Sequence, residues 1–139
     1  MFRRNGGLAA LLLGVGCLVC AQQSPKLKYV TPENISPANG ARMFRTYCAV
    51  CHGVVGKGDG PAAGALRNQP TDLTQLSRNN DGKFPVFRVA GVIQGSSISK
   101  VHGTREMPVW GAVFRTMGSG TVKLRIDNLT SYVESLQQE

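Results

Sequence analysis

Two cysteines and a histidine form the most chemically specific pattern in the chain. They stand together as Cys48, Cys51 and His52 in the pentapeptide Cys-Ala-Val-Cys-His. Residues three and four positions apart share one face of a helix, so these side chains can address one flat ligand together. Two thiols that can add to vinyl groups, next to an imidazole that can reach iron, meet the requirements of covalent haem attachment. The pentapeptide therefore predicts one covalently bound haem c, with thioether bonds at both cysteines and His52 as the proximal iron ligand.

Other uses of a Cys-x-x-Cys pair are open from the spacing alone. In an exported chain the pair could form a disulfide, act as a thiol redox centre or supply half of a zinc site. Zinc would need two more ligands, but the chain has only one further histidine, His102, and its other cysteines lie in the N-terminal segment described below. A thiol redox pair usually follows a buried strand, and no strand-like run precedes Cys48. The histidine that ends the pentapeptide therefore favours haem attachment.

The opposite, distal position of such an iron has few candidate ligands. They are Met43, Met107, Met117 and His102. Met43 lies nine residues before His52 in the same expected helix, so it cannot easily reach the other side of the ring. Met107 precedes Pro108 in a glycine-rich stretch, and the fixed proline dihedral favours an extended residue that can point inward. We therefore expect Met107 as the distal ligand and keep Met117 and the histidine as alternatives.

The N-terminal segment, residues 1–21, is expected to be a secretory signal peptide. Two arginines precede an apolar run, and a small alanine closes it. The run is shorter than the roughly 20 residues that a permanent membrane-spanning helix needs. Cleavage after Ala21 would leave an exported, periplasmic chain that begins at Gln22. Lipidation at Cys17 or Cys20 is the alternative, and it would attach the protein to a membrane.

The charged residues make the chain basic, with 16 Lys and Arg against 8 Asp and Glu and a formal net charge of +8. The basic residues are scattered singly, which together with the export signal argues against a nucleic acid as partner. A basic surface raises the encounter rate with acidic partners. We expect redox partner proteins that carry acidic docking patches.

Two amphipathic helices are expected to frame the haem site. Ser36 can cap a helix that starts at Pro37 and runs to about Cys51. Gly40 lies on its apolar face, where a glycine costs about 0.5–1 kcal/mol relative to alanine and so indicates the close approach of another backbone. A second helix follows a cap at Thr121, and we expect its apolar stripe to pack at this glycine. The stripe comprises Val122, Ile126, Leu129, Val133 and Leu136.

Between these helices the sequence predicts mainly loops. Residues 53–80 are rich in Gly, Pro and Asp, a short helix stopped by a glycine is expected in 84–94, and residues 96–120 contain too many helix breakers for a long element. A loop of that length in a small domain is usually functional. Residues 22–36 are expected to be an extended leader, which leaves 37–139 as the domain.

Several motifs together resemble the class I c-type cytochromes of bacteria. They are Gly40 with Phe44, the haem pentapeptide with Gly53, Gly-Lys-Gly-Asp-Gly-Pro-Ala at 56–62, Met107-Pro108-Val109-Trp110-Gly111, and the closing Leu129-x-x-Tyr132. The likeness covers residues 37–138. It implies an all-α fold in which helices wrap around one haem, the first and last helices cross, and the protein transfers electrons without being an enzyme.

The resemblance also implies further contacts with the cofactor. Pro70 would offer its carbonyl to the second ring nitrogen of His52, which would fix the tautomer and tune the basicity of the ligand. Trp110 and Arg88 are candidates for contact with the haem propionates.

Three functions are compatible with these features. The first, and the one we expect, is a periplasmic one-electron carrier with His/Met ligation. The alternative is a haem c subunit that transfers electrons within a larger periplasmic or membrane oxidoreductase complex. The third is a haem enzyme or gas sensor, which would require that Met107 leave the iron open to a small ligand.

Overall fold

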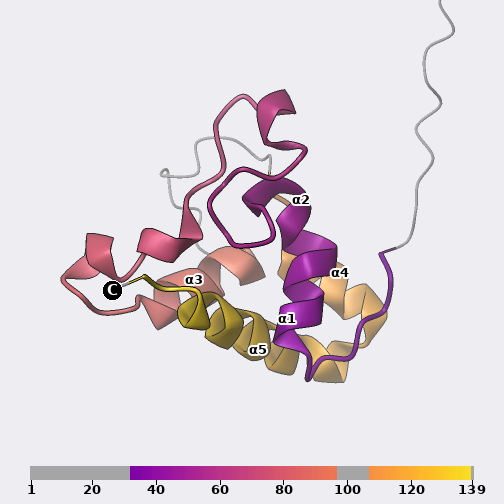
Figure 1. The fold of residues 1–139 in the computed structure, drawn as a ribbon. Coiled ribbons are helices and arrows are strands. Elements are labelled where there is room, and N and C mark those ends of the chain that lie inside the picture. The colour runs from indigo at the N-terminus through magenta and orange to yellow at the C-terminus, as the bar shows by residue number, and fades with distance from the viewer. Residues whose placement is uncertain (1–31, 97–106, 139) are drawn as a thin grey trace, which may run out of the picture. The chain divides into compact units, whose positions relative to one another are not determined.

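Helices are the regular secondary structure of residues 32–96 and 107–138, the part of the chain that the computed structural model describes (Figure 1). These residues contain no strand, and the expected all-α fold is confirmed. The longer elements are α1 (Gly40–Met43), a π-helical turn (Phe44–Cys48), α2 (Ala49–His52), α3 (Val86–Gln94), α4 (Trp110–Met117) and α5 (Val122–Ser135). Short 3-10 turns occupy Ala63–Ala65, Leu73–Gln75, Arg78–Asn80 and Ser119–Thr121.

Several predictions fall outside the described residues. They concern the expected signal peptide 1–21 with its lipidation alternative, residues 22–31 of the expected leader, and the alternative distal ligand His102. Within the described part of the chain, no helix combines the length and the apolar character needed to cross a membrane.

The first helix begins later than the sequence predicts. α1 starts at Gly40, and the side chain of Asn39 caps it by accepting a hydrogen bond from the Arg42 amide at 2.9 Å. The predicted start at Ser36 and Pro37 is wrong. The carbonyl of Ser36 instead accepts from the Asn39 amide at 3.1 Å, which closes a turn just before the helix. An asparagine that accepts a bond from the first turn is as good a cap as serine, so it defines the start.

A π-helical turn, Phe44–Cys48, interrupts the α-helical geometry before the pentapeptide. The Ala49 amide bonds to the Phe44 carbonyl, five residues back. Such a turn accommodates one residue more than an α-helix would. α2 then carries Cys51 and His52 and ends at Gly53, whose φ of 78° favours glycine.

α1 crosses the C-terminal helix α5 at Gly40, as the sequence predicts (Figure 1). A Cβ at Gly40 would overlap the carbonyl oxygen of Asn128 and would lie 3.2 Å from the Cβ of Tyr132. Next to this contact the Phe44 and Tyr132 rings pack with their centroids 5.2 Å apart. The apolar stripe of α5 buries Ile126, Leu129 and Val133 in the core. The missing side chain of one glycine is therefore what lets the two backbones meet.

α4 is a helix that the sequence analysis missed within residues 96–120. Its apolar face contributes Trp110 and Phe114 to the core, where both rings pack against Tyr47 with centroid distances of 5.2 and 5.7 Å. A Cβ at Gly111 would lie 3.2 Å from the carbonyl carbon of Gln94, at the end of α3. Gly111 therefore marks a close contact between two helices. The prediction of a loop is wrong here because the glycine was interpreted as a helix breaker.

A buried arginine joins the segment before α1 to α5. Arg125 is 2% exposed, and its guanidinium donates to the Ile35 carbonyl at 2.6 Å and to Oδ1 of Asn34 at 2.7 Å. The same group lies over the Phe114 ring, 5.7 Å from its centroid. Ile35 is itself part of the core. The last residues of the expected leader therefore pack with the domain.

Candidate functional site

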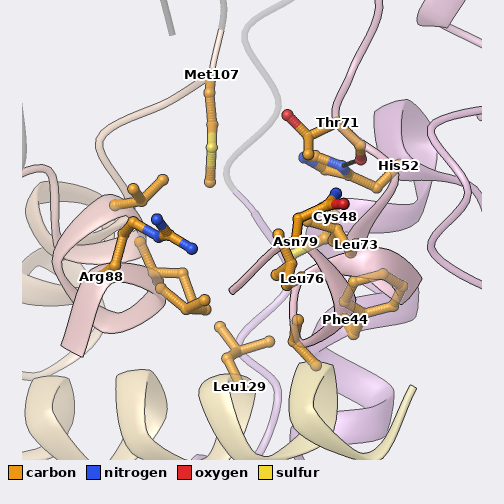
Figure 2. A pocket seen from close by; sticks show the side chains of 14 residues that line it. Phe44, Cys48, His52, Thr71, Leu73, Leu76, Asn79, Arg88, Met107 and Leu129 are labelled. Carbon is orange, nitrogen blue, oxygen red and sulfur yellow. Dashed lines mark hydrogen bonds between the residues drawn. The ribbon is translucent and has the colours of Figure 1, made fainter. Parts of the chain in front are cut away.

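A cavity of about 280 Å³ lies between α3, α5, the first helical stretch and residues 71–79 (Figure 2). Apolar side chains make most of its wall, among them Phe44, Leu76, Val92 and Leu129. The lining residues with a polar or sulfur atom in the side chain are Cys48, His52, Thr71, Asn79, Arg88 and Met107. The cavity thus combines an apolar interior with a few groups that can bind or orient a cofactor.

Two side chains that can bind iron face the cavity from different elements. His52 stands at the end of α2, on the side of the cavity that also carries Cys48. Met107 enters from the segment that precedes α4, and Figure 2 shows its thioether pointing into the cavity opposite these two residues. The fold therefore brings three of the predicted site residues to one cavity.

The imidazole of His52 is oriented by a backbone carbonyl. Nδ1 of His52 lies 3.1 Å from the carbonyl oxygen of Thr71. A carbonyl only accepts, so Nδ1 is the donor and Nε2 is the nitrogen left with a lone pair to bind a metal. The expectation that Pro70 supplies this carbonyl is wrong by one residue. The Pro70 carbonyl instead approaches Gly58, where an added Cβ would lie 3.1 Å from its carbon.

The two pentapeptide cysteines are free thiols with different surroundings. Both side chains are partly exposed, but Cys48 lines the cavity whereas Cys51 is not among the lining residues. Burial and, as the smaller cause, the nearby Cys51 thiol together raise the pKa of the Cys48 thiol to about 12. Both are available for thioether bonds, since neither is in a disulfide. Among the described residues no group of three or more His, Cys, Asp or Glu side chains could hold a metal ion by itself.

The family model of cytochrome c matches residues 37–137, which is most of the chain. The chain belongs to the cytochrome c family. Cytochromes c are electron-transfer proteins that hold a covalently attached haem c. No match was found among curated proteins or among solved structures.

Haem c fits the residues of this cytochrome c. The donor set is suitable, because the pentapeptide offers two free thiols and an imidazole whose Nε2 can bind iron. The walls between His52 and Met107 are apolar, as a flat aromatic macrocycle requires. Asn79 and Arg88 are exposed and still line the cavity, so polar groups lie at its rim, where carboxylate substituents can stay hydrated.

Three other candidate residues of this cytochrome c, Trp110, Met43 and Met117, are not among the residues that line the cavity. Trp110 was expected at the propionates, but it is buried against Tyr47 and is not among the lining residues. Met43 is fully buried, with its sulfur 3.7 Å from Nη1 of Arg125. The sulfur of Met117 lies 3.9 Å from the Tyr47 hydroxyl. Of the methionines weighed as ligands, the structure brings Met107 alone to the cavity.

Thr71, like Asn79 at the rim, is a site residue that the sequence analysis missed. Its carbonyl is directed by the next turn, where the carboxylate of Asp72 accepts from the amide of Thr74 at 2.9 Å and from its hydroxyl at 2.7 Å. An aspartate that bonds two residues ahead is a recognisable turn signal. The run Pro-Thr-Asp-Leu-Thr could therefore have indicated a fixed carbonyl just before Asp72, although not which atom it would contact.

Proposed function

We propose that this cytochrome c is a one-electron carrier whose haem iron is bound by Nε2 of His52 and the thioether of Met107. The observation that carries the proposal is the position of these two side chains on opposite sides of one apolar cavity. An imidazole and a thioether are the ligand pair typical of electron-carrying cytochromes c, as distinct from open haem sites.

The surrounding residues suit a carrier that exchanges electrons without binding a substrate. Bound haem c supplies the one-electron couple of its iron. The Thr71 carbonyl holds the His52 ring, and apolar side chains exclude water from the cavity. Arg88 at the rim is placed to compensate the charge of a haem propionate. His52 and Met107 can keep their places when an electron arrives or leaves.

The proposal includes an exported, periplasmic location and membership of the bacterial class I group. The sequence alone supports both, through the expected signal peptide 1–21 and the motif set, with lipidation as the alternative way of processing. The domain then comprises residues 37–139, preceded by the leader 22–36.

The partner is proposed to be a redox protein with an acidic patch. Three exposed basic residues, Arg78, Lys83 and Arg88, occur within eleven positions, with Asp81 as the acidic residue between them, and Arg88 lines the cavity. Complementary charge steers a brief encounter and raises the association rate more than the affinity. Small, transient interfaces of this kind suit rapid electron exchange.

The ligation is tested by absorption spectra of the purified holoprotein with Met107→Ala, and Met117→Ala as a matched control. We expect the wild type to be low-spin in both oxidation states and to show a weak far-red sulfur-to-iron band. Met107→Ala should lose that band completely, and its reduced form should bind carbon monoxide. Met117→Ala should keep the band and resist carbon monoxide, because its sulfur lies beside Tyr47.

A wild-type protein that binds carbon monoxide readily when reduced would contradict the carrier proposal and favour a gas sensor or haem enzyme. A far-red band that persists in Met107→Ala would assign the distal position to another residue.

A further inference from the structure

The side-chain amide of Gln137, beyond the end of α5, makes hydrogen bonds on both sides. Its Oε1 accepts from the Ser77 amide at 2.8 Å. Its Nε2 donates to the Leu73 carbonyl at 2.7 Å and to the Val133 carbonyl at 2.8 Å. One amide group therefore ties two backbone positions of residues 73–77 to the C-terminal helix, in the way that a neighbouring strand would.

The segment that Gln137 holds is one wall of the haem cavity. Leu73 and Leu76 line the cavity, and Figure 2 places them on the same side as His52 and Thr71. The Thr71 carbonyl, two residues before Leu73, accepts the bond from Nδ1 of His52.

Two backbone bonds, among others, also limit how the wall can move. The Leu73 amide donates to the Gly56 carbonyl at 2.7 Å, and the amide of Gln138 donates to the Thr74 carbonyl at 3.0 Å. The Gln137 side chain differs from these bonds because it alone contacts both ends of the turn 73–77, at Leu73 and at Ser77. Without that side chain, Ser77 and the Leu73 carbonyl would each lose a hydrogen bond to the C-terminal residues, and the turn would be held there by fewer contacts.

We propose that Gln137 is a positioning residue for the proximal ligand: it fixes residues 71–77 against α5 and thereby keeps the Thr71 carbonyl on Nδ1 of His52. The inference rests on the proposed ligation of iron by His52. A residue at the far end of the chain, remote in sequence from the pentapeptide, then contributes to the reduction potential.

The direction of the effect follows from the chemistry of the imidazole. A carbonyl that accepts from Nδ1 makes Nε2 more basic, and a more basic ligand stabilises ferric over ferrous iron. Loosening the Thr71 bond should therefore raise the reduction potential. General loosening of the pocket has the opposite effect, because water that enters the cavity stabilises the more highly charged ferric state. The sign of the change in reduction potential therefore distinguishes a positioning role of Gln137 from a merely structural one.

The test compares the holoproteins of wild type, Gln137→Met and Gln138→Met. Methionine keeps the length of the side chain but loses all three hydrogen bonds of Gln137. Gln138 is the matched control. Its exposed side chain accepts a bond from the Gln75 side chain but does not touch Leu73 or Ser77, and its backbone bond to Thr74 survives substitution. The two measurements are hydrogen exchange of the Ser77 amide and the midpoint potential from spectroelectrochemistry.

We expect Gln137→Met to speed exchange of the Ser77 amide about fivefold or more, the effect of losing one net hydrogen bond. Its midpoint potential should be higher than that of the wild type, while Gln138→Met should match the wild type in both measurements. An unchanged or lowered potential in Gln137→Met would overturn the proposal.

Two observations keep this test independent of folding and of the proposed function. If Gln137→Met does not fold, hydrogen exchange of the wild type still tests the contact. A Ser77 amide that exchanges as fast as an unprotected amide would show that the Gln137 contact is absent and would overturn the proposal. A protected Ser77 amide would support the contact. The far-red band is recorded on the same samples. Absence of that band in the wild type would refute His/Met ligation. A normal band in Gln137→Met together with an unshifted potential would refute only the role of Gln137.

Discussion

Replacing Gly40 with alanine is expected to lower the free energy of unfolding by about 3 kcal/mol, the upper end of the usual cost of overpacking. The new Cβ would overlap the Asn128 carbonyl oxygen and approach the carbonyl carbon to 2.9 Å. Both atoms belong to the backbone of α5, so no side-chain rotation can relieve the overlap, and the two helices must move apart. Denaturant titration of the holoprotein measures the change as a lower midpoint with an unchanged slope.

The matched control is Gly64→Ala. Gly64 lies in the exposed 3-10 turn Ala63–Ala65, where an added Cβ meets no heavy atom within 4 Å. This substitution should be neutral or stabilise by about 0.5 kcal/mol through the unfolded chain. Equal stabilities of the two variants would show that α1 and α5 do not meet at Gly40 in solution.

Arg125→Met is expected to be comparably damaging, at about 3 kcal/mol, which corresponds to the loss of two hydrogen bonds from a charged donor. The substitution leaves the Ile35 carbonyl and the Asn34 amide oxygen without the donor that now lies 2.6 and 2.7 Å away. Methionine fills much of the volume, so the loss reflects the unsatisfied carbonyl of buried Ile35 more than a cavity, whereas exposed Asn34 can bond water instead. Thermal and denaturant unfolding of the holoprotein measure it.

Lys123→Met, on the same helix, is the control for removal of a positive charge. Lys123 pairs with Asp127 at 2.6 Å, but its side chain is 89% exposed, and a surface pair of this kind contributes only about 0.3 kcal/mol. If both variants lost the same small amount of stability, the guanidinium of Arg125 would not hold the N-terminal segment as the structure shows.

The proximal half of the site could be predicted from sequence because its chemistry is local. Cys48, Cys51 and His52 are adjacent in the chain, and their combination has one common use. The helix crossing was predictable for a similar reason, since Gly40 and the regular stripe of α5 each follow from a single helix. Met107 could be selected by elimination, and the structure brings it to the cavity.

The errors arose where a contact distant in sequence decides the local structure. Gly111 reads as a helix breaker, but it lies inside α4 because the carbonyl of Gln94 needs the space. The carbonyl that contacts His52 belongs to Thr71 and not to Pro70, and it stands directly before a turn that Asp72 closes. Neither outcome follows from composition or periodicity.

The π-helical turn Phe44–Cys48 has a consequence for the rotational phase of the first helix. An α-helix advances about 100° per residue, so one additional residue within the turn shifts everything after it by about that angle relative to everything before it. Gly40 stands before the turn and His52 after it. The π-helical turn therefore determines the angle between the helix face that contacts α5 and the helix face that carries the proposed iron ligand. A chain shortened by one residue here could keep either the helix crossing or the proximal ligand in place, but not both.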